Sequence, residues 1–260
     1  LYAISGPSYL MGDFRAFYCA GSAISHGANP YLEEPLRTCE DAAAPPIEPA
    51  VLHGVALPAP LPPYALLPFV PLSRLPFPLA AALYFAALLA AMSASVILFS
   101  RVTGASSLTL NVVFAAITAT VTYYVGQPVP FVFLALAAAS LHLRNERFGA
   151  AGACTALAMI EPQVALPALA AIVLAIPRSR VWVGVVSLVL GIASVAAVGV
   201  DGSVAYLRDV LPAHALANAY EWQFSLTSVL TSLGLGAPLS VHLGEAMFAV
   251  NPDWLSELGD

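Results

Sequence analysis

VTGASSLTLNVVFAAITATVTYYVGQPVPFVFLALAAASLHL, residues 102–143, is a run of 42 residues that contains no Asp, Glu, Lys or Arg. A helix needs about 20 apolar residues to cross the hydrocarbon core of a bilayer, so a run of this length predicts two crossings. Gly126-Gln127-Pro128 supplies turn-forming residues and is the expected break between them. Residues 77–99 and 181–200 are also free of charge and predict further membrane-spanning helices.

The composition of the whole chain agrees with a membrane protein. Of its 260 residues, 60% are hydrophobic and 9% are charged, and the mean hydropathy is +0.84. About a quarter of the residues of a soluble globular protein are charged. We therefore expect an all-α, polytopic transmembrane helix bundle with external interfacial helices. Its expected parts are an external loop with an interfacial amphipathic helix at 1–64, and the bundle at 65–260, which includes an external segment at 201–223.

The positions of the cationic side chains predict the orientation. The chain has no Lys, and five of its nine Arg residues occupy three short loops between expected spans: Arg101, Arg144, Arg147, Arg178 and Arg180. The positive-inside rule assigns such loops to the cytoplasm. Only Glu146 among fifteen acids shares these loops, so the net charge of −6 is mostly external. This charge argues against nucleic acid as a partner.

The opening segment is polar and aromatic. Residues 14–26 carry an apolar face at helical spacing and predict an interfacial helix on the outer leaflet that stops at Gly27. Residues 33–63 are acidic and then rich in Pro, which indicates a loop, and two short apolar pieces, 148–160 and 164–177, flank Glu161-Pro162-Gln163 further along. No apolar span precedes residue 12, so we expect a fragment without its first transmembrane helix and its C-terminal helices.

Two of the three cysteines, Cys19 and Cys39, fall in this opening segment, and Cys154 lies in an apolar stretch. Disulfides persist outside the cytoplasm, so a bridge between Cys19 and Cys39 is expected. It would close a loop of about 20 residues and stabilise the segment by roughly 3 kcal/mol. The alternative is a pair of unrelated buried thiols.

The expected topology brings polar residues from distant parts of the chain to the external ends of helices. They are Asp13, Tyr123, Tyr124, Gln127, Glu161, Gln163, His214, Glu221 and Gln223. Glu161 is the most isolated in an apolar context, which favours a functional role or a structural hydrogen bond that pins a broken helix. Asp13 could be the N-cap of the first helix, and His214 could be a general base or an exposed loop histidine. No metal-ligand spacing and no phosphate-binding loop is found, so we expect neither metal nor cofactor.

Several short motifs occur in an order and spacing that resembles glycosyltransferase family 87. They are Gly12-Asp13-Phe14, Phe17-Tyr18, Ala20-Gly21, Gly27-Ala28-Asn29-Pro30-Tyr31, Leu61-Pro62-Pro63-Tyr64, Gly126-Gln127, Glu161-Pro162-Gln163 and Gln223-Phe224-Ser225-Leu226. The resemblance extends over about residues 12–230. This family belongs to the GT-C superfamily and includes mannosyltransferases that use polyprenol-phosphate-mannose.

The resemblance implies an inverting hexosyl- or pentosyltransferase that moves a sugar, mannose or similar, from a polyprenyl-phosphate donor to a hydroxyl of a lipid or glycan acceptor. It places the protein in the bacterial cytoplasmic (inner) membrane, among membrane lipids, with the active site on the extracytoplasmic side. Asp13 would be the catalytic carboxylate, with His214 as a possible partner. The candidate substrate-binding residues are Arg15, Tyr123, Gln127, Glu161, Gln163, Glu221 and Gln223.

One position departs from the family pattern. Many members carry Lys-Pro-Gln where this chain has Glu161-Pro162-Gln163, which reverses the charge at a place that could face a phosphate. Either an external Arg such as Arg15 or Arg208 binds the phosphate, or the activity is different or weaker. Two other readings of the chain remain, a secondary transporter of a small polar solute and a non-catalytic membrane scaffold.

Overall fold

The computed structural model describes residues 11–43, 59–119 and 126–211, and every regular element within these ranges is a helix. The protein is an all-α membrane helix bundle, as the composition predicts. The chain divides into two compact units, Leu1–Gly199 and Val200–Asp260. The elements that carry the candidate site lie in the first unit.

The first helix, α1, spans Gly12–Ser25, close to the expected 14–26. Its N-cap is Met11, whose backbone is left-handed (φ 65°), and the amide of Arg15 donates to the carbonyl oxygen of Met11. Asp13 therefore lies in the first turn, and the interpretation of Asp13 as the N-cap is wrong. A carboxylate in the first turn still interacts favourably with the positive end of the helix dipole.

The second helix, α2, spans Glu33–Ala43, where the sequence indicated a loop, so this part of the 33–63 prediction is wrong. The sequence at its start favours a helix, because Arg37 forms ion pairs with Glu33 and Glu34 one turn before it. A disulfide joins Cys39 to Cys19 of α1, with the Cα atoms 5.6 Å apart. This covalent link and the packing of α1 on α2 hold the two helices together.

Two short helices, α3 (Pro63–Leu66) and α4 (Phe69–Leu72), lead from this region into the bundle. Phe69 of α4 packs against Phe14 and Phe17 of α1, with ring centroids 6.1 and 5.3 Å apart. Tyr31 donates its hydroxyl hydrogen to the carbonyl oxygen of Leu61 at 2.9 Å, which fixes the segment before α3.

The bundle follows in chain order. Its helices are α5 (Phe77–Thr103), α6 (Ser107–Ala119), α7 (Val129–Arg144), α8 (Phe148–Leu157), the 3-10 turn η5 (Ala158–Ile160), α9 (Pro162–Ala175), the 3-10 turn η6 (Pro177–Ser179) and α10 (Arg180–Ala205). Helix α5 packs on α7, and α8 packs on α7 and α9. Within the ranges that the structure describes, two helices are long and apolar enough to cross a membrane, α5 and the helical stretch Pro177–Val210.

The α10 helix is interrupted at Gly199 (φ 76°, ψ 177°), next to the boundary between the two units. After α10, Tyr206–Val210 form a π-helical turn, η7. The external segment expected at 201–223 is therefore described only in its first part, and the rest lies outside the described ranges.

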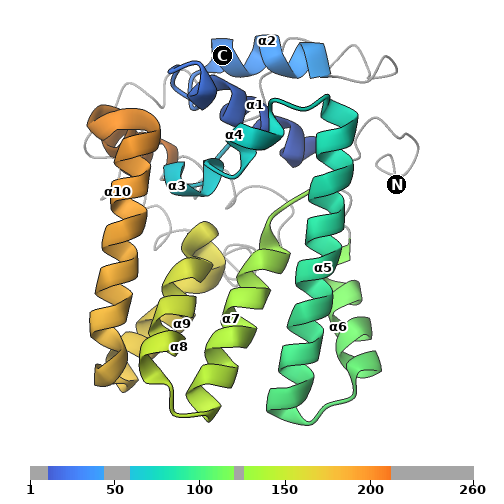
Figure 1. Ribbon diagram of the computed structural model, residues 1–260, viewed down its shortest axis with the longest axis vertical. Coiled ribbons are helices and arrows are strands. Elements are labelled where there is room, and N and C mark those ends of the chain that lie inside the picture. Colours follow the sequence, from blue (N-terminus) through green and yellow to red (C-terminus); the bar gives the residue numbers. More distant parts are fainter. Residues whose placement is uncertain (1–10, 44–58, 120–125, 212–260) are drawn as a thin grey trace, which may run out of the picture. The chain divides into compact units, whose positions relative to one another are not determined.

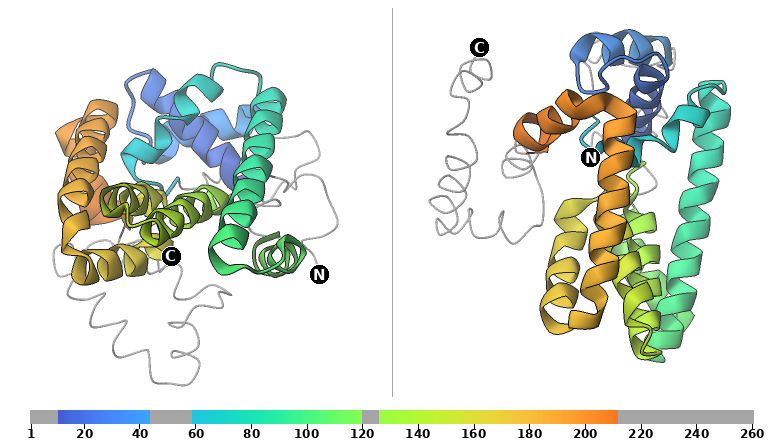
Figure 2. Two further views of the ribbon diagram at one scale, coloured as in Figure 1. Left: turned by 60° about the horizontal axis from the view of Figure 1, so that its bottom comes forward. Right: turned by 60° about the vertical axis from the view of Figure 1, so that its left-hand side comes forward.

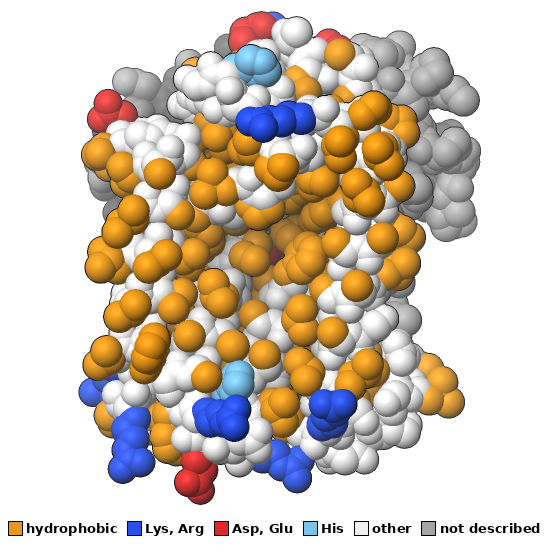
Figure 3. Space-filling model, viewed as in Figure 1, with side chains coloured by type: hydrophobic (Ala, Val, Ile, Leu, Met, Phe, Trp, Pro, Cys, Tyr) orange, Lys and Arg blue, Asp and Glu red, His pale blue; other side chains and the backbone are white. Residues whose placement is uncertain are grey.

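Helices α1 to α4 gather at one end of α5 and α7 in all three views (Figures 1 and 2). Arginines mark the other end of the bundle, which is the lower end in Figure 3. There the Arg144 guanidinium donates to the carbonyl oxygens of Arg101 and Val102 at the end of α5, and Arg180 donates to Val173 at the end of α9. Cations at helix C-termini satisfy carbonyl oxygens that have no partner within the helix.

Candidate functional site

Asp13 and Gln127, which are 114 residues apart in the sequence, meet at the start of α1. Gln127 Nε2 donates to Asp13 Oδ2 at 3.0 Å. The neighbouring Gly126 makes this contact possible, since it is buried and its φ is +88°. A Cβ atom at this position would lie 3.1 Å from the Cβ of Phe14 and 3.2 Å from the sulfur of Met11. Gly126 therefore lets the chain pass directly against the first turn of α1.

Glu161 lies in the turn between η5 and α9, outside the two spanning helices, and is 4% exposed. Its backbone is extended (φ −120°, ψ 92°), and Pro162 begins α9 behind it. The Tyr64 hydroxyl of α3 donates to the carbonyl oxygen of Met159, which holds this turn against the α1–α4 region. Burial, and then the negative charge of Asp13, raise the pKa of Glu161 to about 7. Near neutral pH, Glu161 therefore carries a proton part of the time.

Tyr84 of α5 is a polar residue of this site that the sequence reasoning missed. The charges of both Glu161 and Asp13 act on it. Its ring stacks on Phe14, the neighbour of Asp13, with centroids 4.7 Å apart, and lies 6.1 Å from the ring of Phe131 on α7. Tyrosine is common near the ends of membrane-spanning helices, so the sequence alone did not mark Tyr84 as a residue of this site.

Of the nine polar residues expected at external helix ends, Asp13, Gln127 and Glu161 thus lie in one region of the first unit. Arg15, a candidate from the first turns of α1, is buried, with 7% of its surface exposed. Gln163 lies in the first turn of α9, and its side chain is outside the description. Arg208 belongs to the second unit, where its Nε lies 3.1 Å from Asp209 Oδ1. The remaining candidates fall outside the described ranges: Tyr123, Tyr124, His214, Glu221 and Gln223.

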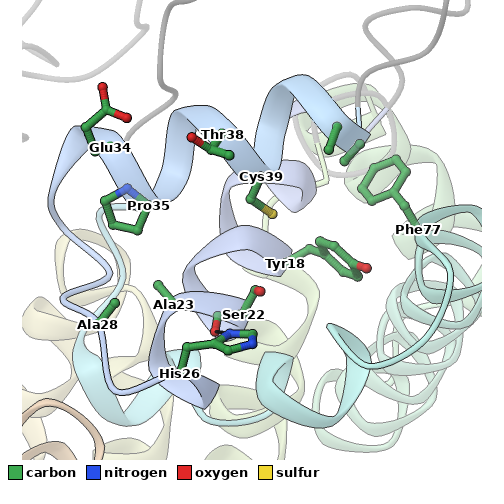
Figure 4. A pocket seen from close by; sticks show the side chains of 12 residues that line it. Tyr18, Ser22, Ala23, His26, Ala28, Glu34, Pro35, Thr38, Cys39 and Phe77 are labelled. Atoms are coloured by element: carbon green, nitrogen blue, oxygen red, sulfur yellow. Dashed lines mark hydrogen bonds between the residues drawn. The ribbon is translucent and has the colours of Figure 1, made fainter.

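The described part of the chain has two hollows. Figure 3 shows one on the apolar face of the bundle, framed by hydrophobic side chains and with an acidic side chain at its bottom. The other is a cavity of about 780 Å³ between α1, α2 and the start of α5. Tyr18, Ser22 and His26 line it (Figure 4). Its lining contains neither Asp13 nor Glu161.

The side chains present can transfer protons and form hydrogen bonds. Within residues 11–43, 59–119 and 126–211, no group of three or more His, Cys, Asp or Glu side chains is placed to hold a metal ion. An amide that binds one oxygen of Asp13 fixes the orientation of the carboxylate. A carboxylate oriented in this way can accept a proton from a hydroxyl group, and a neighbouring protonated acid can donate a hydrogen bond.

Comparison with known proteins identifies the chain at the family level. No curated protein and no solved structure matches it. The model of glycosyltransferase family 87 matches residues 61–255, three quarters of the chain, which include Gln127 and Glu161. Asp13 precedes the matched region. Because the match covers most of the chain and the helical architecture agrees with it, the protein belongs to glycosyltransferase family 87.

Proposed function

We propose that this glycosyltransferase moves a sugar from a polyprenyl-phosphate donor to a hydroxyl group of a lipid or glycan acceptor. The observation that carries the proposal is the Asp13 carboxylate, held by Gln127 at 3.0 Å beside the buried Glu161. An acid at the boundary between the apolar bundle and helices α1 to α4 is placed where a lipid-linked sugar would present its anomeric carbon.

Asp13 acts as the general base in this proposal. It accepts the proton of the acceptor hydroxyl while the acceptor oxygen forms a bond to the anomeric carbon of the sugar. The bond between that carbon and the phosphate oxygen breaks, and polyprenyl phosphate leaves with the electron pair. A single displacement of this kind inverts the anomeric configuration. His214, which lies outside the described residues, is proposed to assist Asp13.

Protonation of Glu161 is proposed to compensate for the charge reversal within the Glu161-Pro162-Gln163 motif. With a pKa of about 7, its carboxyl group is neutral for part of the molecules at neutral pH and can then donate to an oxygen of the donor. A protonated acid repels a phosphate less than a carboxylate would. Gln127 and Gln163 are proposed to bind sugar hydroxyls or phosphate, and Arg15 or Arg208 to supply positive charge.

The apolar hollow in Figure 3 is the proposed entry of the polyprenyl chain from the bilayer. The arginine-rich end of the bundle is proposed to face the cytoplasm of a bacterial cell. Asp13 and the disulfide-linked α1 and α2 then lie on the external side, where the disulfide is stable.

Asp13→Asn in the full-length protein tests the proposal. Asn keeps an oxygen that accepts the hydrogen bond from Gln127, so the fold should persist, while the basicity is lost. We expect transfer from polyprenyl-phosphate-mannose to fall by about 10²-fold or more, which is the usual contribution of a general base. Glu146→Gln, at the arginine-rich end, is the matched control and should retain full activity. Full activity of a folded Asp13→Asn variant would reject the catalytic role.

A further inference from the structure

The hydroxyl group of Tyr84 is buried without a hydrogen-bond partner. Tyr84 is 4% exposed, and its hydroxyl oxygen neither donates to nor accepts from any group in the part of the chain that the structure describes. Buried polar groups without a partner are rare in folded proteins, and each costs free energy. Such a group is retained at a functional site when a ligand supplies the missing partner.

Other tyrosines nearby are fully satisfied. The hydroxyls of Tyr18, Tyr31 and Tyr64 each donate to a backbone carbonyl oxygen, of Leu75, Leu61 and Met159 respectively. All three are less buried than Tyr84. The absence of a partner is therefore specific to the most buried of these four tyrosines.

The Tyr84 ring is held on several sides, so its hydroxyl cannot swing away to find another partner. Phe14 of α1 stacks on it at 4.7 Å, Phe69 of α4 lies at 5.4 Å and Phe131 of α7 at 6.1 Å, measured between ring centroids. Three elements thus fix the direction of the hydroxyl, which is the preorganisation that a binding group requires.

The charges around this hydroxyl indicate the ligand. Both Asp13 and Glu161 act on it electrostatically, so an oxygen bound there would be exposed to the negative charge of these acids. A phosphate oxygen carries negative charge and would be repelled. A sugar hydroxyl is neutral, and it can accept a hydrogen bond from Tyr84 while it donates one to a carboxylate.

We propose that Tyr84 binds a sugar hydroxyl at this site by donating a hydrogen bond to it. The inference rests on the proposed sugar transfer and adds a substrate-binding residue to it. The hydroxyl belongs either to the sugar of the donor or to the acceptor, and the two cases differ in which Michaelis constant depends on Tyr84.

Tyr84→Phe in the full-length protein, with Tyr64→Phe as the matched control, tests the inference. Each substitution removes one hydroxyl group from a tyrosine of the same region. Only the substitution of Tyr64 also removes a hydrogen bond within the protein. We expect Tyr84→Phe to melt at or above the wild-type temperature and Tyr64→Phe to melt below it. We also expect Tyr84→Phe to lower kcat/KM about tenfold, mostly through KM for one substrate.

The outcomes separate this inference from the function on which it rests. A larger KM for polyprenyl-phosphate-mannose assigns the bound hydroxyl to the donor, and a larger KM for the acceptor assigns it to the acceptor. Unchanged kinetics of Tyr84→Phe beside an active wild type would overturn this inference alone. A lower melting temperature of Tyr84→Phe would also overturn it, because the hydroxyl would then have a partner within the protein. Absence of transfer by the wild type would overturn the proposed function as well.

Discussion

Gly126→Ala should separate Gln127 from Asp13. The substitution adds a Cβ atom 3.1 Å from the Cβ of Phe14 and 3.3 Å from its backbone nitrogen, at a residue whose φ is +88°. Two costs follow. A residue with a Cβ pays about 1–2 kcal/mol in left-handed backbone, and overpacking a well-packed site costs about 1–3 kcal/mol more. The free energy of unfolding should therefore fall by about 2–5 kcal/mol in total.

Gly104→Ala is the matched control, because it pays only the first of these costs. Its φ is +75°, and a Cβ atom there would have no neighbour within 4 Å. It lies at the end of α5 beside Arg101, at the arginine-rich end of the bundle. The difference in stability between the two variants, measured by denaturant titration in the same detergent, isolates the contact with α1.

The activity of the same two variants tests the role of that contact. Relief of the clash moves the Gly126-Gln127 segment away from α1 and lengthens the hydrogen bond to Asp13. A misplacement of 1 Å costs about 10²-fold in rate, so a shift of about half that size should lower the rate of sugar transfer about tenfold. Gly104→Ala should keep the wild-type rate. Equal stability and equal activity of the two variants would refute the claim that Gly126 positions Gln127.

Two further predictions concern the charge of Glu161 and the disulfide. Because the pKa of Glu161 is raised from its ordinary value of 4.5 to about 7, the neutral form is favoured in the folded protein. The neutral form stabilises the folded protein fully below the ordinary pKa, and this contribution is lost as the pH rises through about 7. The free energy of unfolding taken from wild-type unfolding curves should therefore fall across this range, whereas that of Glu161→Gln should not. A pH dependence that persists in Glu161→Gln would show that another group titrates. The double variant Cys19→Ser/Cys39→Ser should lose roughly 3 kcal/mol of stability, and a reducing agent should weaken the wild type but leave the variant unchanged.

The sequence predicted the helices of the bundle well, because their ends carry strong local signals. Arg101 and Arg144 mark the ends of α5 and α7, and Gly126 marks the break before α7. Helix α2 was missed because Pro35 and several acids resemble loop composition. Pro is tolerated in a first turn, where its missing amide has no partner to lose.

The candidate site was predicted in part, and the difference has a physical reason. Asp13, Gln127 and Glu161 could be named in advance because each is a polar residue in an apolar context at an expected helix end. Their pairing depends on the close approach of Gly126 to α1, which no local pattern reports. Tyr84 depends on packing alone, since its partners come from α1, α4 and α7.

The disulfide between α1 and α2 also bears on how the enzyme matures. Thiols stay reduced in the cytosol of most cells. In the proposed orientation, Cys19 and Cys39 would therefore form their disulfide only after this part of the chain has crossed the membrane. The helix that carries Asp13 would then be linked to α2 only after translocation. In a chain that is still being synthesised, or that is inserted in the opposite orientation, α1 would lack the disulfide to α2. In the proposed orientation, the disulfide-linked enzyme would occur only on the side of the membrane on which we place its substrates.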